Sequence, residues 1–161
     1  MAFVPLSINA QNAKVVNAYN YLNRYNKDKS VDDLRSARQN IDEASVHENT
    51  SGKPKTWFYR GNVYMTLFTT ELRKEVPDAL KQAADSYAKV LELDPDYENA
   101  NESYALAVLA YKNSGVLYFN EGNFPEALNA FEKVIGLTSK RGNPDKDAIE
   151  NAAISAMRAK D

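Results

Sequence analysis

The stretch YKNSGVLYFNEGNFPEALNAFEKV, residues 111–134, decides the fold of this chain. Apolar residues recur at helical spacing on both sides of a short polar centre. Asn123 followed three residues later by Glu126 is a helix-opening pattern, so the stretch predicts one helix ending near Asn120 and another opening at Asn123. A connection this short predicts that the two helices pack as an antiparallel hairpin.

Small and aromatic residues in this stretch suit close packing of two helices. Gly115 and Ala127 would let the backbones approach, while Tyr118 and Phe131 would fill the space beside them. We assign these residues to the core, because such packing explains them without a cofactor or stacking site.

Helical spacing extends over nearly the whole chain, and runs of β-branched residues with alternating polarity are missing. The chain is therefore predicted to be all-α. Start signals predict seven helices: about 12–25, 30–46 opened by Ser30 and Asp33, one from Pro54, one from Pro77 or Asp78, 94–120, one from Asn123, and one from Asn143 and Pro144 to the chain end.

A second copy of the pattern lies upstream at Trp57, Gly61 and Tyr64, followed by Ala83 and Tyr87. Trp57 and Ala83 are 26 positions apart, whereas Tyr111 and Ala127 are 16 apart, a difference of ten. This difference predicts an insertion at about 68–76, as a loop or helical extension at the rim rather than in the core. A more degenerate copy can be drawn through Tyr19, Leu22, Ala37, Ile41 and Ala44.

These residues resemble the tetratricopeptide-repeat family, and the resemblance covers nearly the whole chain. It implies an α-α superhelix of three helix pairs plus a terminal helix, with units at about 12–49, 54–95 and 96–141 and the last helix at 144–161. The spacing from Pro95 to Tyr111 is longer than the family's. The helix at 94–120 should therefore overhang the array or break near Asn99 to Asn101.

Composition excludes several classes of function. The chain has 161 residues, a formal net charge of -2, no cysteine and one histidine, His47, so one domain is expected and neither nucleic acid nor thiolate chemistry is favoured. The acidic LDPDYE at 93–98 and the NEGN at 120–123 lack the pattern of a calcium loop or a phosphate cradle. We expect no enzyme, no cofactor, no metal and no transmembrane segment.

The first ten residues, MAFVPLSINA, are more apolar than the sequence after them. Residues 1–10 could be the remnant of a secretory signal or a disordered start, with the repeat domain covering 11–161. This interpretation favours an exported or periplasmic location, and a cytoplasmic one is the alternative.

In the tetratricopeptide-repeat family, the first helix of each pair lines a concave groove that holds peptides. The resemblance therefore implies a protein-interaction scaffold with a protein or peptide partner. The groove positions transferred to this chain are Asn17, Asn20, Arg24, Lys55, Tyr59, Asn62, Lys112, Asn113, Val116 and Asn120, with Asp147, Glu150 and Ile154 at the far end. Arg24, Lys55 and Lys112 are expected to form one continuous cationic surface with asparagines between them.

Two further possibilities stay open. Some glycan-binding envelope proteins are similar to this repeat architecture, and Tyr21, Tyr25 and Tyr59 could supply an aromatic platform for a glycan. The terminal helix carries Ile154 and Met157 on its outer side, so it could cap the array imperfectly or mediate self-association.

Overall fold

The computed structural model describes residues 7–160 of the chain, and side chains from Asn12 onward. Within this range the backbone forms seven α-helices, one short 3-10 helix and no strand, which confirms the all-α prediction. The elements are α1 (Ser7–Asp28), α2 (Val31–Val46), α3 (Pro54–Phe68), η1 (Glu71–Lys74), α4 (Ala79–Leu93), α5 (Ala100–Asn120), α6 (Phe124–Lys140) and α7 (Lys146–Arg158).

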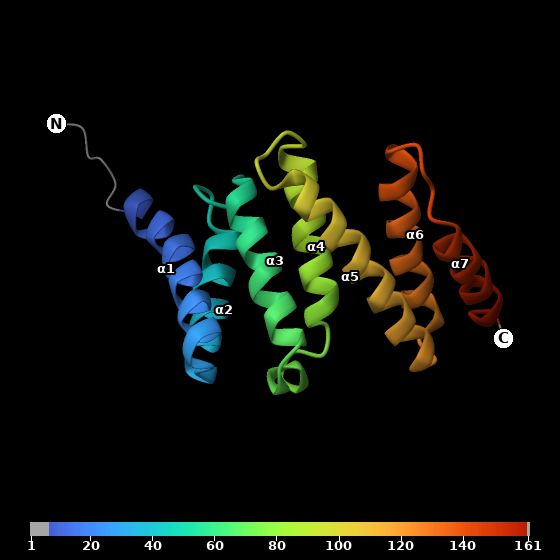
Figure 1. The fold of residues 1–161 in the computed structure, drawn as a ribbon, viewed down its shortest axis with the longest axis horizontal. Helices are drawn as coiled ribbons and strands as arrows, with labels where there is room; N and C mark the ends of the chain where they lie inside the picture. The colour runs from blue at the N-terminus through green and yellow to red at the C-terminus, as the bar shows by residue number, and fades with distance from the viewer. Residues whose placement is uncertain (1–6, 161) are drawn as a thin grey trace.

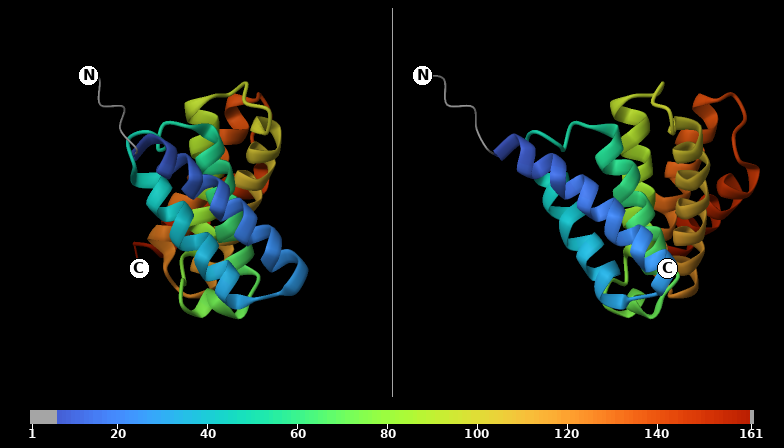
Figure 2. Two further views of the ribbon diagram at one scale, coloured as in Figure 1. Left: turned by 90° about the vertical axis from the view of Figure 1, so that its left-hand side faces the viewer. Right: turned by 60° about the vertical axis from the view of Figure 1, so that its left-hand side comes forward.

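The helices stand side by side in chain order along the long axis of the molecule, with the two ends of the chain at opposite ends of the row (Figure 1). Consecutive helices pack against each other, most extensively α3 with α4 and α1 with α2, while α5 packs equally on α4 and on α6. Figure 2 shows the same row from its N-terminal side, where α1 and α2 form one face of the array. This is a helical repeat in which each hairpin buries its apolar side against the next.

Two of the predicted helix starts are confirmed by their local geometry. The Ser30 hydroxyl accepts a hydrogen bond from the Asp33 backbone N–H at 3.4 Å, so Ser30 caps α2 as expected. Pro54 is the first residue of α3, where a proline costs the helix no hydrogen bond.

Three helix starts differ from the prediction. α1 begins at Ser7 rather than near Asn12, so the part of the predicted signal remnant that the structure describes, residues 7–10, is helical. The remainder of that stretch, residues 1–6, lies outside the described residues. α5 begins at Ala100 rather than at Asp94 or Pro95, because the Asp94 carboxylate accepts from the Asp96 N–H and holds a turn. Of the two expected outcomes for this helix, the break near Asn99 is the one observed.

The start of α7 also differs. Its cap is Asp145, whose carboxylate accepts from the Ala148 N–H at 2.9 Å, and the predicted Asn143 and Pro144 lie in the loop before it. An aspartate is as good a cap as an asparagine, and Pro144 is compatible with either position.

Glycines allow the two helices of a pair to pack closely, as predicted. A Cβ at Gly61 would lie 2.5 Å from the ring of Tyr87, and one at Gly115 would lie 2.7 Å from the ring of Phe131. Tyr64, Tyr87 and Phe131 are among the largest fully buried side chains. Assigning Trp57 and Tyr118 to the core was too strong, because both are only half-buried at its edge.

The inserted segment at 68–76 is not confined to the rim. It forms η1, and its Leu72 and Val76 are only 5% and 3% exposed. Both side chains belong to the main hydrophobic cluster. The prediction that this segment stays out of the core was therefore wrong, and removing it would expose apolar surface.

A polar junction joins α2, α3 and α4. The Asp42 carboxylate accepts from Arg60 Nε at 3.1 Å and from the Tyr64 hydroxyl at 2.7 Å. Arg60 also donates to the Ser86 hydroxyl of α4 at 2.8 Å, and its guanidinium lies 4.3 Å from the centre of the Tyr64 ring. The side chain of Arg60 is only 14% exposed, so this network fixes the first helix pair against the second.

Candidate functional site

The predicted groove residues lie on α1, α3 and α5, the first helices of successive pairs. Seven of the ten are exposed and three are half-buried. The exposed ones are Asn17, Asn20, Arg24, Lys55, Asn113, Val116 and Asn120, and the half-buried ones are Tyr59, Asn62 and Lys112.

Two of the three predicted cations are paired with carboxylates of the chain itself. Arg24 lies 2.9 Å from Asp33, whose side chain is 9% exposed. Lys112 Nζ lies 2.9 Å from Asp145 and 3.3 Å from Asp147. The hydrogen bond between Lys112 and Asp145 raises the pKa of the lysine and lowers the pKa of the aspartate.

These pairs correct the expectation of a continuous cationic surface. Lys112 ties α5 to α7 and also pairs with Asp147, which was placed at the far end of the predicted groove. Lys55 lies 5.7 Å from the centre of the Tyr59 ring, a distance suited to a cation–π contact. Lys112 is thus engaged within the fold, whereas the side chain of Arg24 is 61% exposed beside Asp33 and Lys55 is exposed beside Tyr59.

Asn62 is also used inside the fold. Its side-chain oxygen accepts from the Tyr87 hydroxyl at 2.8 Å, which links α3 to α4. The amide was expected to bind a partner's backbone, but this bond occupies the oxygen. Asn62 therefore has a structural role beside the groove role predicted for it.

Tyr59 brings α1 and α3 together. Its ring stacks on Tyr19 with centroids 5.0 Å apart and an interplanar angle of 25°. Tyr19 had been placed in the degenerate first unit and not among the groove residues, yet it is 42% exposed. The apolar series Val15, Ala18 and Leu22 is the buried one on α1, and a register drawn through it could have suggested a surface position for Tyr19.

Exposed large apolar side chains are distributed unevenly over the helices. Of the ten large apolar residues that the described range leaves exposed, eight lie on α1, α5 and α7. They are Val16, Tyr19, Leu109, Val116, Leu117, Ile149, Ile154 and Met157. The other two, Val31 and Val46, stand at the two ends of α2. α3, α4 and α6 have none, so the exposed apolar side chains are concentrated on α5 and at the two ends of the array.

Each of the three tyrosines of the predicted glycan platform has a neighbour within the chain. Tyr21 has the Arg24 guanidinium 5.3 Å from its ring centre, and Tyr25 has the Lys29 ammonium at 5.2 Å. Tyr59 instead stacks on Tyr19. Each ring thus has a different partner from its own neighbourhood.

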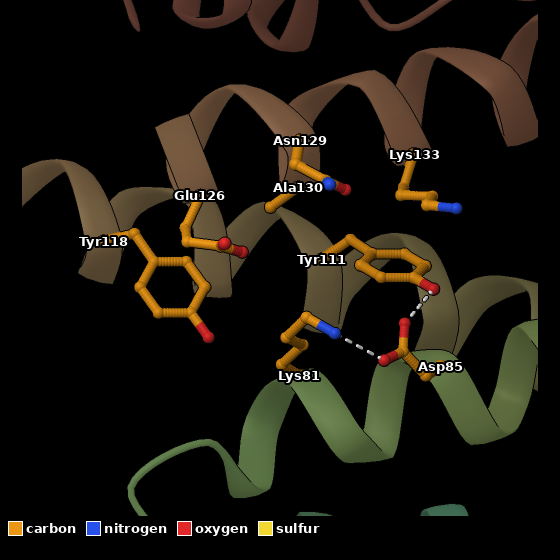
Figure 3. Close-up of a pocket in the computed structure, with 8 residues that line it drawn as sticks. All are labelled: Lys81, Asp85, Tyr111, Tyr118, Glu126, Asn129, Ala130 and Lys133. Atoms are coloured by element: carbon orange, nitrogen blue, oxygen red, sulfur yellow. Dashed lines mark hydrogen bonds and ion pairs between the residues drawn. The ribbon is translucent and has the colours of Figure 1, made fainter. Parts of the chain in front are cut away.

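A polar cavity of about 280 Å³ lies between α4, α5 and α6 (Figure 3). The Asp85 carboxylate lines this cavity, where it accepts from the Tyr111 hydroxyl at 2.6 Å and pairs with Lys81 at 2.8 Å. No group of three or more potential metal ligands occurs in the part of the chain that the structure describes. Across the same described residues, no helix is both long and apolar enough to span a membrane.

Buried tyrosines predict a loss of stability at alkaline pH. Burial raises the pKa values of Tyr87 and Tyr111 well above the ordinary value, and it raises the pKa of Tyr97 to about 12. The folded chain keeps these protons while the unfolded chain releases them near pH 10, so the free energy of unfolding should fall as pH rises above about 10. Urea titrations at pH 8 to 12 should show this fall, with a smaller slope for Tyr87→Phe. A midpoint constant to pH 12 would contradict the prediction.

The fold and its surface define the class of the protein as an α-helical repeat array whose exposed apolar residues gather on one set of helices. Residues 108–141, which comprise most of α5 and all of α6, match the sequence model of the tetratricopeptide repeat. This match shows that residues 108–141 form a tetratricopeptide repeat, and the all-helical array on either side of it is consistent with further repeats of this kind. No curated protein and no solved structure matches the chain significantly.

Proposed function

We propose that the chain is a protein-interaction scaffold that binds an extended segment of a partner across what we call the first-helix face. This face consists of Tyr19, Tyr59, Leu109, Val116 and Ile154. The proposal rests on one observation, the concentration of exposed apolar side chains on α1, α5 and α7. Tetratricopeptide repeats are in general protein-interaction modules, and a scaffold of this kind needs no catalytic group.

The exposed apolar and amide side chains of this face indicate the chemistry of the partner segment. Leu109 and Val116 are about half exposed and stand two helical turns apart on α5, so they lie on one side of that helix. Asn113 and Asn120 are exposed beside them and can bond a partner's backbone in either direction. The partner segment should therefore be apolar, with its affinity coming from burial more than from ion pairs.

The test begins with a random 12-residue peptide library displayed on phage and selected against the full chain. Selected peptides should bind Leu109→Asp/Val116→Asp at least about tenfold more weakly than wild type, because burying one such side chain contributes about 1.5 to 3 kcal/mol. A matched control is Val31→Asp/Val46→Asp, which alters two exposed apolar residues outside the face. Equal loss in both variants, or loss in neither, would refute the proposed face.

A further inference from the structure

A second possible binding surface lies on the other side of the array, between α4 and α6. Both helices pack on α5, which forms the floor between them. Three cavities follow one another along this line and share lining residues: Lys81 and Tyr118 belong to the first two, and Lys133 joins the central cavity to the last. We call this the α4–α6 groove.

The end of the groove near the C-terminal ends of α4 and α6 combines an apolar floor with a cationic rim. We call the cavity at this end the upper cavity. It has a volume of about 410 Å³, and Ala88, Leu91 and Leu137 are among its lining residues. Lys133, Lys140 and Arg141 also line it, against one carboxylate, Glu92. That carboxylate is already paired with Lys89 at 2.7 Å. The lining thus carries three positive charges and one negative in a chain whose net charge is -2.

The charge changes along the groove. In the central cavity Lys81 and Lys133 balance Asp85 and Glu126, and the Tyr111 hydroxyl and Lys81 together satisfy Asp85 (Figure 3). The other end is lined by Asp78 and Glu121, with Lys81 as its only cation. A bound segment would therefore be favoured in one direction, with its acidic end at the upper cavity.

Arg141 is held in place for such contacts. Its guanidinium lies 3.7 Å from the centre of the Tyr104 ring and donates to the Asn101 side chain at 3.0 Å. Both partners lie in the first two turns of α5. These turns belong to the segment between Pro95 and Tyr111, which is longer than in the family pattern. A guanidinium oriented in this way loses less conformational freedom when it meets a carboxylate.

We infer that the α4–α6 groove binds a segment of a partner protein in which an apolar residue is flanked by carboxylates. The apolar residue would pack on Leu91 and Leu137, and the carboxylates would meet Lys133, Lys140 and Arg141. The charge complementarity of the upper cavity selects this chemistry over a neutral apolar segment. The site is separate from the first-helix face, so either surface can function without the other.

The experiment uses the full chain carrying Leu109→Asp/Val116→Asp, in which the first-helix face is impaired. A displayed random 12-residue library selected on this variant should enrich peptides that have Leu, Ile or Phe beside Asp or Glu. Their dissociation constants should rise at least tenfold when Lys133→Glu, Lys140→Glu and Arg141→Glu are added. They should stay within twofold for Lys27→Glu, Arg73→Glu and Lys74→Glu, an equal change of charge at other exposed sites.

Three outcomes would overturn the inference. Enriched peptides could lack carboxylates, they could bind the charge-reversed groove unchanged, or the matched control could weaken them equally. Sedimentation of the chain with phosphatidylglycerol vesicles, without enrichment of acidic peptides, would assign the cationic rim to a lipid surface instead. A failure of the first-helix face in its own test would leave these outcomes unaffected, since the two selections use different surfaces.

Discussion

Replacing Gly61 with leucine should destabilise the fold by about 3 kcal/mol, at the upper end of the usual cost of overpacking a core. Even the first added carbon would lie 2.5 to 2.7 Å from three ring atoms of Tyr87. That ring cannot swing aside easily, because it is 1% exposed and its hydroxyl is bound to Asn62 on the same helix as Gly61. Urea unfolding followed by circular dichroism at 222 nm would measure the change.

Two other glycines provide a graded comparison. Gly115→Leu should cost about 1 to 3 kcal/mol, because the Phe131 ring that it meets is equally buried but, unlike Tyr87, has no hydroxyl bond to hold it. Gly136→Leu should stabilise the chain by about 0.5 to 1 kcal/mol. Gly136 lies away from both ends of α6, is exposed to solvent, and has no atom within 4 Å of the position that a Cβ would take. If all three substitutions had the same effect, helix propensity and not packing would govern these sites.

Sequence reasoning succeeded where local pattern and close packing coincide. The spacing of Gly115, Ala127 and Phe131 depends only on helical period and hairpin geometry, and the structure places all three in the core as predicted. The start of α5 was harder to predict from the sequence, because an Asp-Pro pair occurs both at the beginning of helices and in turns. The turn held by the Asp94 carboxylate, together with the packing of Tyr97 on Phe58 and the burial of Ala100, distinguishes the two.

The candidate site was harder to predict than the fold. Helical register places Lys112 and Asn62 on the first helices of their pairs, but it says nothing about which groups their side chains meet. Lys112 is paired with Asp145, which follows it by 33 positions, and Asn62 binds Tyr87, which follows it by 25. These partners are brought close by the packing of whole helices. A list of surface positions therefore overestimated the number of groups available to a partner.

The junction between the first two helix pairs leads to the second large prediction. Asp42→Ala should cost about 2 to 3 kcal/mol, because it removes the acceptor of both Arg60 and Tyr64 and leaves a mostly buried guanidinium without its carboxylate. The estimate stays below the full cost of breaking a buried ion pair, since the Asp42 side chain is 36% exposed and water can partly replace it. The matched control is Asp32→Ala on the same helix. The side chain of Asp32 is 92% exposed, so its loss should cost no more than about 0.5 kcal/mol.

A double-mutant cycle would separate this junction from a general weakening of α2. If the hydroxyl of Tyr64 acts through Asp42, then Asp42→Ala should cost about 1 kcal/mol less in a Tyr64→Phe background than in the wild type. The stacking of Tyr19 on Tyr59 provides an independent measure of how the first and second helix pairs are held together, because the two rings belong to the pairs that Asp42 joins. Nuclear Overhauser contacts between the two rings should weaken in Asp42→Ala and persist in Asp32→Ala. Equal costs for the two aspartates, with the ring contacts unchanged, would mean that apolar packing alone sets the angle between the first and second pairs.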